Sequence, residues 1–193
     1  HASVVLDGES IPILHDNPLR HVYKTMQMVS QTPADSFDPR RTLGDGIGES
    51  LRNAGLSRKE TREKVEALLK DCGLPPEYAG RYPHQVSGGQ CQRAAIARAL
   101  AIAPRLLICD EITSALDVTV QKEILELLNT LRTRQGRGLS ILFISHDISL
   151  VQQFCDRVLV MYRGEIVEEG TPDEVIRNPQ NDYTKRLIDS VLS

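Results

Sequence analysis

The sequence has no apolar run that approaches the roughly 20 residues needed to cross a bilayer, and it has no strong excess of charge. Its 23 Lys and Arg against 26 Asp and Glu give a formal net charge of −3. This balance provides no electrostatic attraction for nucleic acid or for an anionic membrane surface. We therefore expect no nucleic-acid partner, and we expect any membrane association to go through another protein.

Cysteine is sparse, and no two cysteines have CxxC spacing. Cys72, Cys91, Cys109 and Cys155 are scattered through segments that we predict to be helix or buried strand. This predicts reduced, cytosolic core residues. The chain shows no signal peptide and begins at His1 rather than Met, which indicates a processed, cloned or truncated start.

Residues 86–117 hold the patterns that carry most of the chemistry. Ser87 opens an Ala-rich run, and Gln90 follows at the spacing of a capping box at a helix start. Gly88 and Gly89 remove side chains from the positive end of that helix, so that bare N–H groups can approach an anion, with phosphate as the expected guest. An ordinary capped helix with two permissive glycines would show the same four residues.

The apolar run 106–109 predicts a buried parallel strand that ends in Asp110 and Glu111. At the C-terminal edge of such a strand, the first carboxylate can hold a hydrated Mg²⁺ and the second can orient an attacking water. A strand that simply leaves the core would also end in charged residues. Residues 114–117 form a tight connection, with Asp117 as a candidate N-cap of the next helix.

At this spacing the three segments resemble the signature motif, the Walker B motif and the D-loop of ABC-type ATPases. His146, in Ile-Ser-His-Asp, matches the switch histidine of that family, and Gln31 before Thr-Pro matches its Q-loop glutamine. The resemblance extends over essentially the whole chain and implies ATP and Mg²⁺ as cofactors. The site residues that it implies are Glu111 and His146 for catalysis, Asp110 and Gln31 for the metal, and Gln31, Ser87, Gly88, Gly89, Gln90, Asp110 and Asp117 for the nucleotide.

The same resemblance implies a role for each residue. Glu111 would polarise the attacking water, His146 would sense the γ-phosphate, and Gln31 would link the site to a membrane partner. Residues 87–90 would grip the nucleotide of an opposing subunit.

The order of elements predicts an α/β fold with a P-loop NTPase-like parallel sheet core and a helical subdomain insert. Residues 1–193 would be a partial ABC ATPase domain, with 43–86 as the insert and 171–193 as a C-terminal helical tail. The expected strands are two within 3–14 around Asp7-Gly8, then 24–30, 106–111, 139–145 as a second buried strand, and a hairpin over 157–169. The expected helices are 43–54, weakened by three glycines, a capped one from 57, an amphipathic one from 118 to 136, and 147–154.

The sequence lacks the phosphate-binding Walker A loop, GxxxxGK followed by Ser or Thr. None of its lysines, at 24, 59, 64, 70, 122 and 185, follows a glycine. The simplest interpretation is a chain that starts just after the Walker A helix, as in a truncated gene product or a fragment. Such a chain would also lack two or three N-terminal strands. In the resembled fold the strand that feeds the phosphate loop lies beside the Leu106–Asp110 strand, so its loss would expose apolar side chains and strand edges.

Three segments narrow the family. Residues 31–40, 111–121 and 178–184 resemble the subunits that power dipeptide, oligopeptide and nickel import, although the Cys-rich C-terminal segment of some members is absent. The resemblance implies an energy-coupling ATPase that pairs with a second ABC ATPase subunit, as a homo- or heterodimer, and with integral membrane permease subunits. Its place would be peripheral, at the cytoplasmic face of the inner membrane.

Two other functions remain open. A degenerate, non-catalytic subunit would explain the missing Walker A, and it would supply only the signature motif in trans. A soluble ABC protein of DNA repair or translation would require a long coiled coil or a basic linker, and the sequence shows neither.

Overall fold

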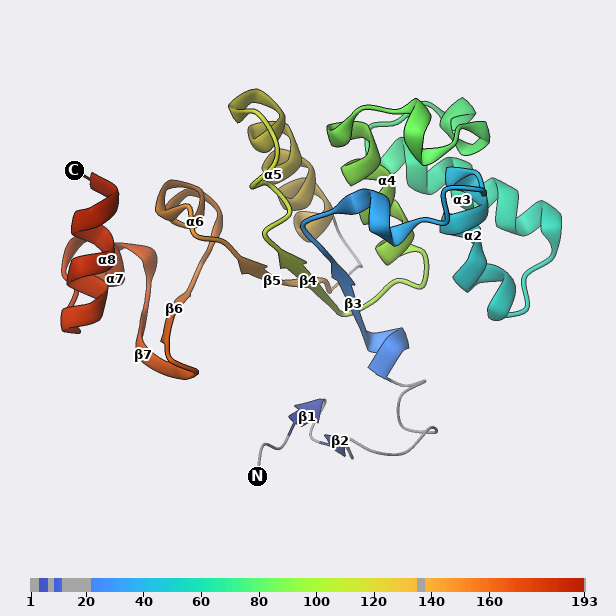
Figure 1. Ribbon diagram of the computed structural model, residues 1–193. Helices are drawn as coiled ribbons and strands as arrows, with labels where there is room; N and C mark the ends of the chain where they lie inside the picture. The colour runs from blue at the N-terminus through green and yellow to red at the C-terminus, as the bar shows by residue number, and fades with distance from the viewer. Residues whose placement is uncertain (1–3, 7–8, 12–21, 135–137, 193) are drawn as a thin grey trace. The chain divides into compact units, whose positions relative to one another are not determined.

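The computed structural model describes residues 4–6, 9–11, 22–134 and 138–192, which fall into two compact units, 1–142 and 143–193 (Figure 1). The first unit contains β1 (Val4–Leu6), β2 (Glu9–Ile11), β3 (Met26–Val29), η1 (Pro33–Ser36), α2 (Leu43–Asn53), α3 (Arg58–Asp71), η2 (Pro76–Gly80), η3 (Pro83–Gln85), α4 (Gly88–Leu100), β4 (Leu106–Asp110) and α5 (Val118–Thr133). Strand β5 (Ser140–Ile144) ends this unit and begins the second. The second unit continues with α6 (Ile148–Phe154), β6 (Val158–Tyr162), β7 (Glu165–Gly170), α7 (Pro172–Arg177) and α8 (Asp182–Leu192).

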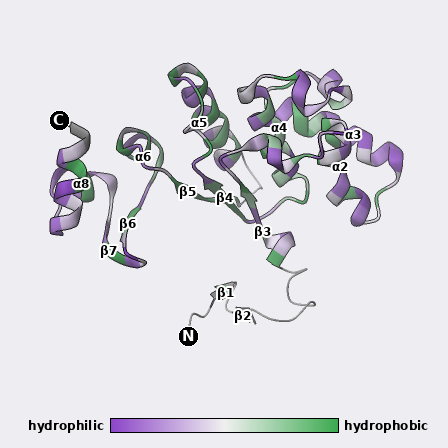
Figure 2. Cartoon of the chain, in the orientation of Figure 1, coloured by the Kyte–Doolittle hydropathy of each residue, from purple (hydrophilic) through white to green (hydrophobic). Residues whose placement is uncertain are grey.

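The core of the first unit is a sheet with the strand order β3-β4-β5. β3 and β4 run parallel, with Met26 opposite Leu106 and Val29 opposite Cys109, and Figure 2 shows β4 and β5 coloured mainly as hydrophobic. This confirms the predicted α/β parallel core. The strand predicted from residue 24 starts later than expected, because residues 22–25 are helical.

The structure differs from two predictions, one about the burial of β5 and one about the strands that neighbour β4. Strand β5 was predicted to be buried, yet Leu142 and Ile144, which are two residues apart and so lie on one face of the strand, are each 44% exposed. β5 is also last in the strand order, and no further strand among the described residues pairs with its outer edge. β3 and β5 hold both edges of β4. The missing strand that we expected beside Leu106–Asp110 therefore has no place there.

The first two strands, β1 and β2, pair antiparallel as predicted, from Val4 opposite Ile11 to Leu6 opposite Glu9. The turn predicted at Asp7-Gly8 lies outside the described residues. The predicted loop 34–40 contains the short 3₁₀ helix η1.

Helix α2 forms despite three glycines, because each one allows a close approach. A Cβ at Gly44 would lie 2.7 Å from the Ala79 carbonyl oxygen, and one at Gly46 would lie 2.6 Å from the Phe37 ring. At Gly48 it would lie 2.7 Å from the methyl group of Thr61 on α3. The packing gained from these contacts offsets the roughly 1 kcal/mol of helix propensity that each glycine costs. Thr42 caps the helix by accepting from the Asp45 N–H at 3.2 Å.

Helices α3, α4 and α5 follow the sequence patterns closely. Ser57 and Glu60 form the predicted capping box of α3, and Val65, Leu68, Leu69 and Cys72 are buried. α5 buries Ile124, Leu127, Leu128 and Leu131. It ends at Thr133, three residues before the predicted end at Gly136, which lies outside the described residues.

In the second unit, β6 and β7 form the predicted antiparallel hairpin. Arg163 and Gly164 have φ values of 52° and 85°, so both central residues of the two-residue loop are left-handed, as a type I′ turn requires. Asp147 caps α6 by accepting from the N–H groups of Ser149 and Leu150. The helix was predicted over residues 147–154, whereas its cap was not.

The carboxylate of Glu168 on β7 joins the hairpin to the segment that leads into α8. It accepts from the backbone N–H of Gln180 at 2.7 Å and of Asn181 at 3.1 Å. The rings of Tyr162 and Tyr183 stack with centroids 4.1 Å apart, so the same two segments also meet through an aromatic contact. In the part of the chain that the structure describes, none of the helices combines the length and apolar character needed to cross a membrane.

Candidate functional site

The N-terminus of α4 forms the capping box that the sequence predicted at Ser87 and Gln90. Ser87 Oγ accepts from the Gln90 N–H at 3.3 Å, and Gln90 Oε1 accepts from the Ser87 N–H at 2.9 Å. The capping box thereby satisfies the amides at its two ends. Within the described chain, the N–H groups of Gly88 and Gly89 donate no hydrogen bond. Two donors at the positive end of the helix are therefore open to an anion.

The two glycines differ in their structural reasons. A Cβ at Gly88 would come no closer than 3.8 Å to Leu116, so this position is open. A Cβ at Gly89 would lie 2.6 Å from a methyl carbon of Val120 on α5. The absence of a side chain at Gly89 therefore allows α4 and α5 to pack, in addition to leaving an N–H group bare.

The acidic end of β4 is formed by Asp110 and Glu111, both of which are half-buried. Glu111 has a left-handed backbone with φ 50°, a conformation that is unfavourable for a residue with a Cβ. Cys109 directly precedes Asp110, and burial raises the pKa of its thiol to about 12. That thiol is therefore an inert core group, as the sequence indicated.

Gln31 reaches the loop that follows these carboxylates. Its Nε2 donates to Ser114 Oγ at 3.0 Å, across 83 positions of the sequence. Ser114 Oγ in turn donates to the Glu111 carbonyl oxygen at 2.9 Å. The structure thus brings together the predicted site residues Gln31 and Glu111, and it adds Ser114, for which sequence reasoning assigned no role.

Asp117 is the N-cap of α5, as predicted, and accepts from the Val120 N–H at 3.0 Å. Gln121, one turn into α5, donates to the carbonyl oxygens of Thr113 at 3.0 Å and of Leu116 at 3.2 Å. Gln121 therefore ties the segment between β4 and α5 to the first turn of α5. Sequence reasoning gave Gln121 no such role, because a glutamine in a helix carries no signal of its own.

His146 follows β5 in the second unit and is exposed. The turn around it is ordered by the Asp147 N–H, which donates to Ser145 Oγ at 3.0 Å. The role implied for His146 therefore stays a prediction, and the residues that the structure brings together in the first unit are Gln31, Glu111 and Ser114.

The available donors fit the groups that the sequence implied. Asp110 offers a carboxylate, and Gln31 offers the amide oxygen that is left when its nitrogen binds Ser114; both are oxygen ligands of the kind that Mg²⁺ prefers. Among the described residues, no three His, Cys, Asp or Glu side chains cluster as a metal site. These residues would thus hold only part of a coordination sphere, completed by water and phosphate oxygens, as is usual for Mg²⁺.

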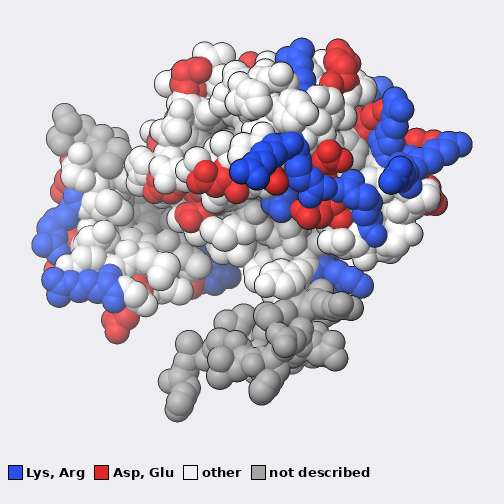
Figure 3. Space-filling view, turned by 45° about the vertical axis from the view of Figure 1, so that its right-hand side comes forward, with Lys and Arg blue, Asp and Glu red and all other residues white. Residues whose placement is uncertain are grey.

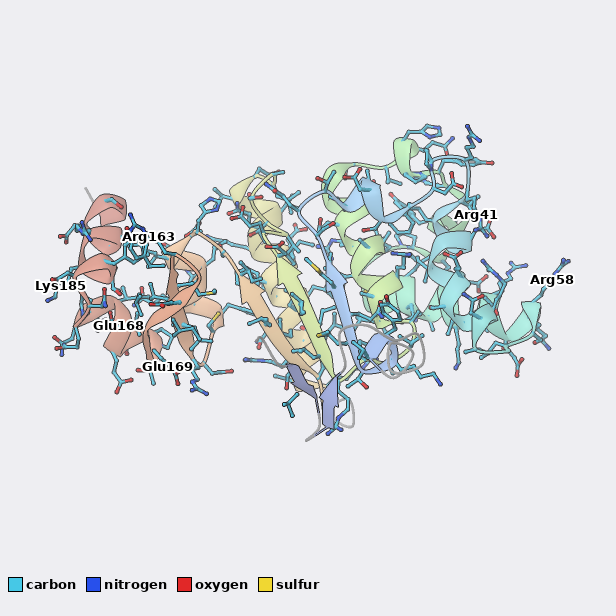
Figure 4. All side chains as sticks on the ribbon, turned by 60° about the horizontal axis from the view of Figure 1, so that its bottom comes forward. Arg41, Arg58, Arg163, Glu168, Glu169 and Lys185 are labelled. Atoms are coloured by element: carbon cyan, nitrogen blue, oxygen red, sulfur yellow. The ribbon has the colours of Figure 1, made fainter. Side chains whose placement is uncertain are left out.

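A cavity of about 840 Å³ is lined by residues of α2, α3 and η2, and by Arg41 and Thr42 just before α2. Its lining mixes both signs of charge, and Figure 3 shows Lys and Arg side chains interspersed with Asp and Glu over the molecular face that it displays. The buried Thr61 also lines it, and its hydroxyl has no hydrogen-bond partner among the described residues. Figure 4 labels Arg41, just before α2, and Arg58, the first residue of α3. The charged lining residues are Arg41, Asp45, Arg52, Arg58, Arg62, Glu66 and Glu77.

A parallel sheet strand that ends in carboxylates, together with a helix N-terminus open to an anion, is the architecture of a nucleotide-binding α/β protein. The chain belongs to the ABC transporter family, whose family model matches residues 2–114. This confirms the resemblance that the sequence motifs indicated.

Two curated relatives illustrate the similarity. The chain is 49% identical over 174 residues to the oligopeptide transport ATP-binding protein OppF of Salmonella typhimurium, covering 89% of this chain and 52% of that protein. It is 44% identical over 189 residues to the glutathione import ATP-binding protein GsiA of Escherichia coli, covering 97% of this chain and 30% of that protein. The chain therefore spans about half the length, or less, of these relatives.

Among solved structures, the fold is similar to that of the ATP-binding cassette MJ0796, a dimer in a post-hydrolysis state bound to ADP and Pi. The TM-score is 0.76 at 29% sequence identity, over 88% of this chain and 73% of that one. The similarity confirms the predicted fold class.

Proposed function

We propose that the chain is the ATP-binding, energy-coupling subunit of an ABC importer for peptides. The observation that carries this proposal is the hydrogen bond between Gln31 and Ser114, because it ties the Q-loop glutamine to the segment directly after the Walker B carboxylates. The relatives named for oligopeptide transport and glutathione import support the peptide class. Nickel, the other cargo of the resembled subgroup, stays a prediction.

Mg-ATP, when bound, supplies the phosphoanhydride bond whose hydrolysis drives the transport cycle. Asp110 would hold the metal, with the Gln31 amide oxygen as a further ligand. Glu111 would act as the general base that orients the attacking water, and His146 would sense the γ-phosphate. Asp117, the N-cap of α5, would hold in place the loop that precedes α5 and faces the nucleotide.

The signature helix serves a nucleotide bound by the opposing subunit in this proposal. Ser87 and the open N–H groups of Gly88 and Gly89 would meet the γ-phosphate of that nucleotide, with Gln90 holding the cap in shape. The partners would be a second ABC ATPase subunit, identical or homologous, and integral membrane permease subunits. The chain would then act peripherally, at the cytoplasmic face of the inner membrane.

The helical insert offers a surface for the permease partner. It follows Gln31 in the chain, and its cavity of about 840 Å³ is lined by charges of both signs, which suits a polar cytoplasmic segment rather than an apolar one. Reversing the charge at Arg58, an exposed lining residue, should weaken co-purification with membranes that contain the permease subunits. Reversal at Arg157, in the second unit and outside the cavity, is the control.

The 193 residues contain no Walker A motif, so the proposal includes a consequence for this chain alone. A phosphate loop supplies several charge-assisted contacts, each worth roughly 1.5 to 3 kcal/mol. Without them, the site formed by Asp110 and Glu111 would not hold Mg-ATP usefully. The absence of a Walker A motif also supports the alternative function. In that alternative the chain is a non-catalytic subunit that contributes only Ser87–Gln90 in trans.

A version of the chain fused to the Walker A segment of a peptide-importer relative tests the catalytic assignment. There, Glu111→Gln should keep ATP binding and abolish steady-state turnover, because the amide preserves the shape but cannot accept a proton. Near-normal hydrolysis by that variant would remove Glu111 from the proposed role.

A further inference from the structure

Ser114 uses its single hydroxyl in two hydrogen bonds whose directions fix each other. The hydroxyl carries one proton, and the Glu111 carbonyl oxygen, at 2.9 Å, can only accept it. The lone pairs of Ser114 Oγ are then left for Gln31 Nε2, which donates at 3.0 Å. The chain of bonds runs from the Gln31 amide through Ser114 to the backbone of Glu111.

The first consequence concerns the carboxamide of Gln31. An exposed carboxamide can present either its nitrogen or its oxygen to a given side, since the two ends have the same shape. Ser114 can accept but has no second proton to give to Gln31. It therefore selects the orientation in which Nε2 faces the loop and Oε1, the end that can bind a cation, remains available.

The second consequence concerns the backbone of Glu111. Its φ of 50° lies in the left-handed region, which a residue with a Cβ occupies only where its surroundings hold it. Both the N–H of Ser114, at 3.1 Å, and its Oγ, at 2.9 Å, donate to the Glu111 carbonyl oxygen. One residue thus secures the turn from which the Glu111 side chain projects.

We infer that Ser114 is a positioning residue, which fixes at once the orientation of the Gln31 carboxamide and the left-handed backbone of Glu111. Through it, a displacement of Gln31 reaches Glu111 directly, without passing through a bound nucleotide. The catalytic meaning of this link rests on the proposed function. The positioning itself is a property of the nucleotide-free chain, and it is tested there.

The test is ¹⁵N NMR of the full chain without nucleotide, with the Gln31 side-chain amide assigned from its loss in Gln31→Glu. Ser114→Ala should shift the two Gln31 amide proton signals and speed their exchange with solvent several-fold. Ser114→Thr, which keeps the hydroxyl, should restore both properties. The double variant Ser114→Ala/Ala115→Ser, which moves the hydroxyl by one residue, should not restore them.

A role confined to the turn would predict shifted backbone signals near residue 111 and an unchanged Gln31 carboxamide in Ser114→Ala; that result overturns the inference. Gln31→Leu supplies the reciprocal measurement and does not depend on the stability of Ser114→Ala. It should shift the backbone amide signals of Ser114 and Glu111, and their constancy would overturn the inference as well. Neither readout involves ATP. The inference about Ser114 can therefore fail or hold independently of the proposed ATPase function, which the Glu111→Gln experiment tests.

Discussion

The guanidinium group of Arg93 on α4 donates to the carboxylate of Glu123 on α5 at 2.8 Å. The same side chain donates to the carbonyl oxygen of Cys72, just after α3, at 3.2 Å. Arg93 is only 16% exposed, whereas Glu123 is 52% exposed. One side chain therefore joins the end of α3 to α4 and α5.

Arg93→Ala should destabilise the chain. Hydrogen bonds to charged groups contribute roughly 1.5 to 3 kcal/mol, and the exposure of Glu123 reduces this through solvent screening. We expect the free energy of unfolding to fall by about 1 to 2 kcal/mol in urea denaturation. Arg62→Ala is the matched control, because the Arg62–Glu66 pair has the same 2.8 Å distance but an 81% exposed arginine. Equal losses in the two variants would contradict the role of Arg93.

The two signature glycines should respond differently to alanine. Gly89→Ala places a methyl group 2.6 Å from Val120, and overpacking of this kind costs about 1 to 3 kcal/mol. Gly88→Ala meets only Leu116, at 3.8 Å, so alanine should be tolerated there and helix propensity should favour it. Urea denaturation of both variants measures the difference. A stable Gly89→Ala would show that α4 and α5 do not pack as described.

Stability should fall in acid through carboxylates that accept hydrogen bonds. At Glu168, burial alone would raise the pKa, but the N–H groups of Gln180 and Asn181, the nearby Thr184 hydroxyl and the charge of Lys185 outweigh it and lower the pKa below the ordinary value of a glutamate; Figure 4 labels Glu168 and Lys185. At Glu60, the Ser57 hydroxyl and N–H lower the pKa. At Glu174, the Thr171 N–H and hydroxyl have the same effect.

These lowered pKa values make the protein less stable as the pH falls. Because each folded-state pKa is below the unfolded one, the stabilisation is complete above about pH 4.5 and is lost as the pH falls through the folded values. Thermal unfolding between pH 6 and pH 3 should show a declining midpoint, and Glu168→Gln should flatten the decline. A midpoint that rises toward pH 3 would contradict the assignment.

The 193-residue chain should bind a hydrophobic dye and show limited solubility. Leu142 and Ile144 are each 44% exposed on β5, and no described strand pairs with the outer edge of β5. Leu142→Thr should reduce dye fluorescence, whereas Val118→Thr, at a 66% exposed position away from the sheet, should leave it unchanged. A sharp, reversible thermal transition without dye binding would disprove this expectation.

Much of the fold follows from local patterns. The caps at Ser57, Ser87 and Asp117, and the turn at Arg163-Gly164, are determined by residues within a few positions, so the sequence predicts them. The glycines of α2 are different, because the contacts that favour them come from Phe37, Thr61 and Ala79 elsewhere in the chain. The exposure of Leu142 and Ile144 on β5 likewise depends on which other segments cover that face of the strand, which periodicity along one strand does not contain.

The candidate site divides in the same way. Asp110, Glu111 and Gln31 were found from motifs, but the hydrogen bond from Gln31 to Ser114 spans 83 positions and only the fold brings these side chains together. Serine in a turn is common, so its type gave no signal. The roles of His146 and of the nucleotide contacts remain predictions.

In the proposed assembly, Ser87–Gln90 complete a nucleotide site on an opposing subunit, whereas the chain alone does not hold Mg-ATP. The direct measurement is steady-state ATP hydrolysis by this chain mixed with an intact peptide-importer ATPase whose own signature serine is replaced by arginine. Calorimetry on the isolated chain should accompany it and show no Mg-ATP binding. The wild-type chain should restore hydrolysis at one site per mixed dimer, the site that the intact ATPase forms with Ser87–Gln90 of this chain. Glu111→Gln should restore hydrolysis equally, because Glu111 belongs to the second site, which lacks a Walker A loop. Ser87→Arg should restore nothing, since its bulky side chain stands where the phosphate must approach. Micromolar Mg-ATP binding by the isolated chain, no rescue by the folded wild-type chain, or rescue by Ser87→Arg would contradict the account.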